Sequence, residues 1–113
     1  MQVNSNTIPL TKSTSHVVVD VVDNSAADAT STVIIKKITG EIIATAFDKG
    51  IWIHEKVSPF DRFIIVLEGS AEIIIDKKPN KVVTGSAIII PAHISSSIEC
   101  APGCFKIMQT IIK

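Results

Sequence analysis

The sequence contains few aromatic residues and almost no leucine. Tyrosine is absent, tryptophan occurs once, and leucine occurs twice among 113 residues. The lack of tyrosine removes a side chain that often serves as the general acid in proton-transfer enzymes. Most of the apolar side chains come instead from 21 isoleucines and 11 valines. Because β-branched side chains fit a pleated strand and lose χ1 freedom in a helix, this composition favours β-structure.

The chain also lacks an excess of charge of either sign. It has 11 basic and 11 acidic residues and a formal net charge of zero. Nucleic acids and anionic membranes are captured by basic patches, and no basic stripe with interleaved aromatics occurs here, so we expect neither partner. No apolar run approaches the roughly 20 residues of a membrane-spanning helix. The first 15 residues lack the charged start and apolar core of a secretory signal, so we expect a soluble, cytoplasmic protein.

Cysteine is scarce, with Cys100 and Cys104 flanking the turn A-P-G. A structural zinc site takes four ligands, and no second pair of cysteines exists. A disulfide across a short hairpin is geometrically possible but is disfavoured in a reducing cytosol. We therefore expect two free thiols.

The apolar residues fall in short runs of about four to eight residues, each ended by a turn signal. No segment shows a sustained 3.6-residue period with helix caps. Glycines fall in the gaps between the runs, where positive φ angles are often needed. The pattern predicts an all-β domain. The expected strands lie near residues 16–22, 33–38, 41–47, 51–57, 62–68, 71–76, 81–84, 87–90, 95–100 and 104–112.

Glycine and proline recur at a spacing that is typical of one family. Gly50 is followed by I-W-I-H-E-K-V-S-P-F-D-R-F-I-I-V-L-E and Gly69, and Gly85 is followed by S-A-I-I-I and Pro91. In these stretches and in V-L-E-G-S-A-E-I-I-I-D the chain resembles small cupins over about residues 33–112. The resemblance implies a double-stranded β-helix (a cupin or jelly-roll barrel) and frequently a dimer. It implies no single activity, since cupins include dioxygenases, isomerases, storage proteins and sugar-sensing domains.

Two parts of the chain are distinguished on this basis. Residues 1–32 are expected to form an N-terminal arm with a first strand and a polar loop at 23–32, and residues 33–113 the cupin barrel. We expect residues 1–12 to be mobile. A long apolar strand at 16–22 could pair with a partner subunit or cap its own barrel, because exposed strand edges invite pairing.

The resemblance also locates the positions at which cupins bind metal. The family's His-x-His, glutamate and second-motif histidine fall here on Lys56, Ser58, Arg62 and Ser96. Charged lysine and arginine offer no lone pair, and hydroxyls are weak ligands for transition metals. We therefore expect no metal and no other cofactor. A displaced site would need His54, His93 and Asp61 to converge, and no known ligand spacing supports that.

Alternation of side chains along a strand predicts which residues line the barrel. If the family's ligand positions face inward, so do Lys56 and Ser58, and by the same alternation Trp52 and His54. On the later strands, Arg62 then faces inward with Ile64 and Val66, and Ser96 with Ile98 and Cys100. The candidate ligand-binding residues are Trp52, His54, Lys56, Arg62, Ser96 and Cys100. Alternatives remain for each kind of residue. Lys56 and Arg62 could extend to solvent over apolar surface, His54 could be a structural histidine, and Trp52 could fill the core.

Two classes of function fit these residues. The first is a metal-free cupin with no catalytic residue, which binds a small polar or anionic molecule in the barrel or acts as a structural dimer. The second is a metal-independent sugar isomerase or epimerase with His54 as base and Lys56 as its electrostatic helper. A 46% hydrophobic chain has more apolar surface than a small barrel hides, so we also expect a homodimer.

Overall fold

The computed structural model describes residues 3–6, 10–22, 29–47, 52–100 and 105–113, and for 3–6, 29, 52–56 and 100 it describes the backbone alone. The described part contains one 3₁₀ turn, η1, and strands that follow the expected all-β pattern. The elements are β1 (Val3–Asn6), η1 (Val18–Asp20), β2 (Ala29–Lys37), β3 (Gly40–Phe47), β4 (Trp52–Lys56), β5 (Asp61–Glu68), β6 (Ser70–Ile75), β7 (Lys78–Val83), β8 (Ala87–Ile90), β9 (Ser96–Cys100) and β10 (Phe105–Ile112).

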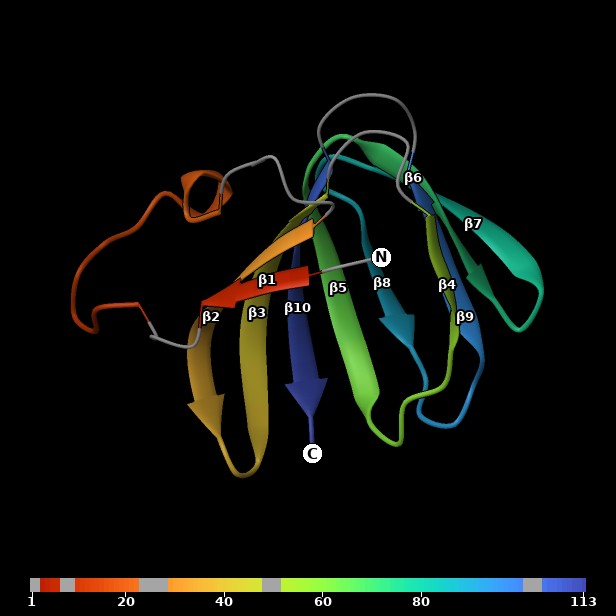
Figure 1. Ribbon diagram of the computed structural model, residues 1–113, viewed down its shortest axis with the longest axis horizontal. Coiled ribbons are helices and arrows are strands. Elements are labelled where there is room, and N and C mark those ends of the chain that lie inside the picture. Colours follow the sequence, from red (N-terminus) through yellow and green to blue (C-terminus); the bar gives the residue numbers. More distant parts are fainter. Residues whose placement is uncertain (1–2, 7–9, 23–28, 48–51, 101–104) are drawn as a thin grey trace.

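The strands form two sheets that face each other (Figure 1). One sheet has the order β1-β2-β3-β10-β5-β8, and the other has the order β4-β9-β6-β7. Strand β10 lies between β3 and β5, and β9 lies between β4 and β6, so strands distant in sequence pair in both sheets. The pairs are antiparallel except for β1 with β2, which is parallel. The all-β prediction is confirmed.

The main core lies between the two sheets. Strand β5 alternates between exposed and buried residues, which places Ile64 and Val66 inside. Phe47 and Phe105 pack with ring centroids 5.7 Å apart. The buried residues of this cluster are Phe47, Ile64, Val66, Ala71, Ile73, Val82, Ile90, Ile98, Phe105 and Ile107. Apolar side chains from both sheets therefore stabilise the barrel by removing their surface from water.

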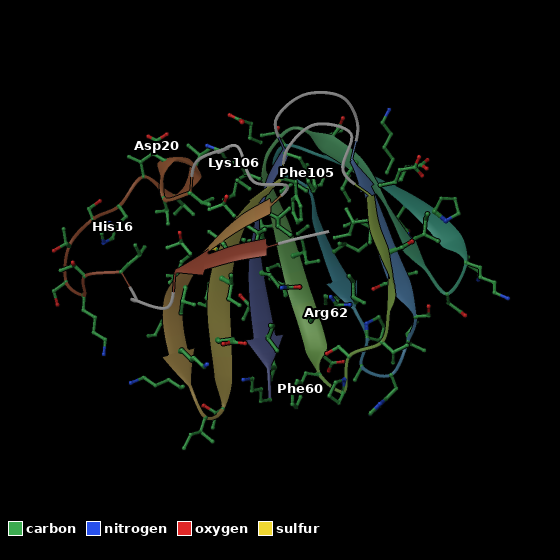
Figure 2. The ribbon with its side chains drawn as sticks, viewed as in Figure 1. His16, Asp20, Phe60, Arg62, Phe105 and Lys106 are labelled. Atoms are coloured by element: carbon green, nitrogen blue, oxygen red, sulfur yellow. The ribbon has the colours of Figure 1, made fainter. Side chains whose placement is uncertain are left out.

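A second, smaller core lies on the outer face of the six-stranded sheet. Val22 is buried there against Ala44 and Ala46, whose small side chains let the N-terminal segment approach the sheet closely. Lys106, which is 8% exposed, donates from Nζ to the carbonyl oxygen of Val19 at 2.9 Å. The segment around η1 is thereby fastened to its own barrel (Figure 2).

The expected strand at 16–22 is wrong. Val18–Asp20 forms a 3₁₀ turn, closed by hydrogen bonds from Asp20 N to Val17 O and from Val21 N to Val18 O. Strand propensity depends on a neighbouring strand with which to pair, and this valine-rich segment lies across a sheet face instead. Two further expectations are wrong. The segment 1–12 was expected to be mobile, but Val3–Asn6 forms a strand. That strand pairs with residues 29–32, which were expected to belong to the polar loop.

The other nine expected strands are confirmed, with ends displaced by a few residues. The gap expected between the strands at 71–76 and 81–84 shortens to a two-residue turn. Asp76 and Lys77 both have positive φ, of 50° and 67°, as a two-residue hairpin turn requires. Pro79 then lies within β7, where it is tolerated because β7 is an edge strand. No helix in the described ranges has the length and hydropathy needed to cross a membrane.

Candidate functional site

Arg62 is buried inside the barrel. It is the second residue of β5, and the alternation of that strand places it on the same face as Ile64 and Val66. Only 7% of the residue is exposed. The expectation of an inward Arg62 is confirmed, and the alternative in which its guanidinium extends to solvent is wrong.

Two neutral side chains hold the Arg62 guanidinium. Nη2 donates to Ser96 Oγ at 2.9 Å, and Nη1 donates to Gln109 Oε1 at 3.5 Å. Ser96 is 5% exposed and comes from β9 of the facing sheet, whereas Gln109 comes from the adjacent strand β10. Nε is buried and has no hydrogen-bond partner among the described residues. In Figure 2 the Arg62 side chain lies in the region between the two sheets.

The charge on Arg62 is not balanced within the described part of the barrel. The ion pair found among the described side chains joins Lys113 to Glu41, not Arg62 to a carboxylate. Burial lowers the pKa of the Arg62 guanidinium, because desolvation disfavours the charged form. An arginine nevertheless stays protonated in proteins at neutral pH. The barrel therefore contains a buried positive charge that only neutral acceptors are seen to contact.

Isoleucines from neighbouring strands lie beside this charge. Arg62 pairs in register with Ile90 on one side and Ile111 on the other. On the facing sheet, Ser96 pairs with Ile75 on one side and, through the backbone register, with Lys56 on the other. Directly paired residues of antiparallel strands lie on the same face of the sheet, so these isoleucines flank the Arg62–Ser96 contact.

Hydrogen bonds connect two loops near Arg62, the loop at 57–60 before β5 and the loop at 91–95 between β8 and β9. The Ser58 carbonyl oxygen accepts from His93 N at 2.7 Å, and Asp61 Oδ1 accepts from Ala92 N at 2.7 Å. Ser58 lies beyond the end of β4, and its hydroxyl accepts from Phe60 N at 3.2 Å, so the strand alternation that predicted an inward Ser58 does not extend to it. His93 is exposed and has a φ of 65°. These residues connect loops 57–60 and 91–95.

Four of the predicted site residues cannot be placed by their side chains. Trp52, His54 and Lys56 lie in β4 and Cys100 ends β9, but their side chains are outside the described residues. Their roles in ligand binding stay predictions. The backbone register pairs Lys56 with Ser96, and it shifts between Ile53 and Lys56. Because of this shift, faces cannot be counted along β4 by simple alternation, as the sequence argument did.

Gln109 is the residue that the sequence reasoning missed. It lies two positions after Ile107, which is 2% exposed, and it pairs in register with the buried Ile64. A polar residue on the inward face of an apolar strand is the signal that could have identified it.

The chemistry of Arg62 and Ser96 does not suit a metal ion. The resemblance to cupins places metal ligands at these two positions. A charged guanidinium has no lone pair to share, and the Ser96 hydroxyl accepts a hydrogen bond from that guanidinium. Among the residues with described side chains, no group of three or more His, Cys, Asp or Glu could hold a metal ion.

Solved structures with the same fold come from several bacteria. A conserved protein of unknown function from Streptococcus pyogenes superposes with a TM-score of 0.85 at 23% identity, over 95% of this chain and 93% of that one. A cupin superfamily protein from Desulfitobacterium hafniense gives 0.84 at 20% identity, over 95% and 97%. A cupin 2 conserved barrel domain protein from Leptotrichia buccalis gives 0.78 at 25% identity, over 84% of this chain and 46% of that one.

Comparison of the sequence with protein families and with curated proteins, by contrast, gives no match. No family model matches the chain. No curated protein matches it either. The superpositions confirm the double-stranded β-helix that the glycine and proline spacing implied. This chain is therefore a small β-barrel protein with the cupin fold.

Proposed function

We propose that this protein binds a small anionic molecule inside its barrel, with Arg62 as the anchoring residue. The observation that supports this is the Arg62 guanidinium itself. The residue is 7% exposed, and its Nε has no partner within the part of the chain that the structure describes. A buried charge is costly unless an opposite charge or a full set of hydrogen bonds compensates it. An anion in contact with Arg62 supplies both.

The hydrogen bonds that Arg62 already makes prepare it for this role. A guanidinium carries five N–H donors in one plane, and the bonds to Ser96 and Gln109 use two of them, so three remain. Those two bonds fix the plane from two different strands. A carboxylate or phosphate can then accept two parallel N–H bonds, the strong geometry of arginine–anion recognition. Little ordering entropy is lost when the binding group is held in place beforehand.

The proposal is one of binding without metal and without catalysis. Arg62 and Ser96 occupy positions at which the resemblance places metal ligands, and they contact each other. The isomerase alternative depends on His54 as a base, and the His54 side chain is outside the described residues. No described contact favours that alternative over binding.

Thermal and chemical unfolding in the presence of anions tests the proposal. Wild-type protein is unfolded with phosphate, sulfate or acetate at constant ionic strength, with chloride as the reference salt. A ligand present at 100 times its Kd raises the free energy of unfolding by about 2.7 kcal/mol. At least one of these anions should stabilise the wild type, and Arg62→Met should abolish that effect.

Lys106→Met is the matched control. Lys106 is a second buried cation at 8% exposure, but it lies on the outer face of the sheet and bonds to Val19. The control should keep the stabilisation by anions even if its baseline stability is lower. Equal stabilisation of wild type and Arg62→Met would contradict the proposal, as would the absence of any stabilisation.

A further inference from the structure

We infer that the Phe60 side chain is a gate over Arg62, and that Lys113 and Glu41 hold this gate closed. The gate controls the access of solvent to the guanidinium, and its use for anion entry rests on the proposed function. With 7% of Arg62 exposed, a molecule from solvent reaches the guanidinium only when a covering group moves. The strand register, the contacts of Lys113 and the fixed backbone around Phe60 identify that group.

The register of the six-stranded sheet places Lys113 next to the row that contains Arg62. Glu41, Ile111 and Arg62 pair across β3, β10 and β5 and form that row. Lys113 follows Ile111 by two residues, and its backbone N–H donates to Thr39 O at 3.0 Å, which continues the ladder beyond β10. Since side chains two positions apart on a strand share a face, Lys113 lies on the same face as Arg62, one row closer to the end of the barrel.

Lys113 joins Phe60 to Glu41. Its Nζ lies 5.9 Å from the centroid of the Phe60 ring, within the range of a cation–π contact. The same Nζ lies 3.7 Å from Glu41 Oε1, and the two charged side chains are 28% and 14% exposed. Phe60 is half-buried and precedes Arg62 by two residues. In Figure 2 Phe60 lies at the end of the barrel at which β5 begins, and Arg62 lies further inside.

The backbone on both sides of Phe60 is fixed, so the ring is the part that can move. The Ser58 carbonyl oxygen accepts from His93 N, and Asp61 Oδ1 accepts from Ala92 N, each at 2.7 Å. Opening therefore requires rotation of the Phe60 side chain, without displacement of the loop. Partly exposed ion pairs and cation–π contacts are individually weak, so thermal motion can open a gate that they hold.

The opposite direction along β5 is closed by the core. Ile64 and Val66 follow Arg62 on the same face and are 0% and 1% exposed. Protein interiors of this kind are close-packed, so a molecule that entered from that end would have to displace these side chains. The end that Phe60 closes is the shorter route to the guanidinium.

Hydrogen exchange of the Arg62 side chain tests the gate. Arg62 is the one arginine of the chain, so its Nε–H resonance in ¹⁵N-labelled protein is unambiguous. Nε is buried, and exchange requires solvent to reach it. Exchange measured by NMR at constant pH should be about tenfold faster in Phe60→Ala than in the wild type. In Glu41→Gln, which removes the charge that holds Lys113, it should be about threefold faster. The double variant should exchange no faster than Phe60→Ala, because both changes act through one gate.

Two substitutions elsewhere are matched controls. Val57→Ala removes a 60% exposed apolar side chain from the same loop, and Glu72→Gln neutralises an exposed carboxylate of β6. Neither should change the exchange of the Arg62 Nε–H. Exchange of the Ile64 backbone amide reports unfolding of the barrel and should stay constant in Glu41→Gln. Equal acceleration at Arg62 and Ile64 in both gate variants would show general destabilisation and would overturn the inference, as would unchanged exchange at Arg62.

The kinetics of anion binding separate the gate from the proposed function. For whichever of phosphate, sulfate and acetate stabilises the wild type, Phe60→Ala should raise the association and dissociation rates by similar factors of about ten. Faster Arg62 exchange in the gate variants without binding of any of the three anions would support the gate and contradict the proposed function. Anion binding with unchanged rates and unchanged Arg62 exchange in Phe60→Ala would contradict the gate and leave the proposed function standing.

Discussion

The Arg62 guanidinium and the Ser96 hydroxyl join the two sheets of the barrel through a hydrogen bond of 2.9 Å. Arg62 belongs to the six-stranded sheet and Ser96 to the four-stranded sheet, and both are more than nine-tenths buried. This polar link crosses a core that consists mainly of apolar side chains. Its contribution to stability and its contribution to ligand binding can be separated by substitution.

Ser96→Ala should destabilise the protein. The substitution leaves Nη2 of a buried guanidinium without its acceptor, which costs about 1–3 kcal/mol. Urea unfolding followed by circular dichroism measures the difference. Ser97→Ala removes the hydroxyl of the adjacent residue, which faces the opposite side of β9, and should cost less. Equal losses in the two variants would show that the Arg62–Ser96 bond does not contribute specifically.

Arg62→Met should fold and be at least as stable as the wild type in buffer free of binding anions. Burial lowers the pKa of Arg62, so folding disfavours the charged form, and the substitution removes that cost. Replacement of buried charges by apolar side chains is often neutral or stabilising by about 1–4 kcal/mol. A loss of several kcal/mol would instead show that the guanidinium has a compensating partner that stabilises the fold.

The effect of Arg62→Met should not depend on pH near neutrality. A basic group with a lowered pKa destabilises the folded state by the full amount at every pH below its folded pKa, and this cost disappears only when the pH rises above its unfolded pKa. Arginine is not deprotonated in the accessible range, so the stability difference should stay constant between about pH 5 and pH 9. Urea unfolding at several pH values measures it. A difference that changes through pH 6–7 would point to coupling with a histidine.

We propose a homodimer that uses the outer face of β5 and β8. Phe63 and Ile89 pair in register on that face and are 38% and 61% exposed. Exposed apolar patches of this kind often mark interfaces. Light scattering at micromolar concentration should give twice the monomer mass, and Ile89→Lys should halve it. Ile38→Lys, at a 96% exposed turn position, is the control and should leave the mass unchanged. A monomeric wild type would contradict the proposal.

Protein purified without chelator should contain well under one equivalent of iron, manganese, nickel, copper or zinc. The reason is that a guanidinium and a hydroxyl offer no set of converging lone pairs of the kind these metals require. Elemental analysis by inductively coupled plasma measures the content. Stoichiometric metal that survives dialysis would overturn the metal-free interpretation and favour an enzyme.

The part of the site on β5 followed from the resemblance together with the regular alternation of that strand. Arg62, Ile64 and Val66 were placed inside by counting along one strand, and their burial confirms the count. The same count failed to apply along β4, where the register shifts between Ile53 and Lys56. A shift of one residue exchanges the two faces of a strand, and it arises from pairing with β9, which lies about 40 residues away.

The sequence by itself determined the all-β class and nine of its strands, because β-branched runs and turn residues act locally. The barrel type came from the resemblance of its glycine and proline spacing to that of cupins. Only the tertiary structure decided the partners of Arg62, since Ser96 and Gln109 lie 34 and 47 residues away and meet it through sheet packing. It also decided that Val18–Asp20 forms a 3₁₀ turn despite its valines. Strand propensity is expressed where a neighbouring strand accepts the backbone hydrogen bonds, and that availability depends on the whole chain.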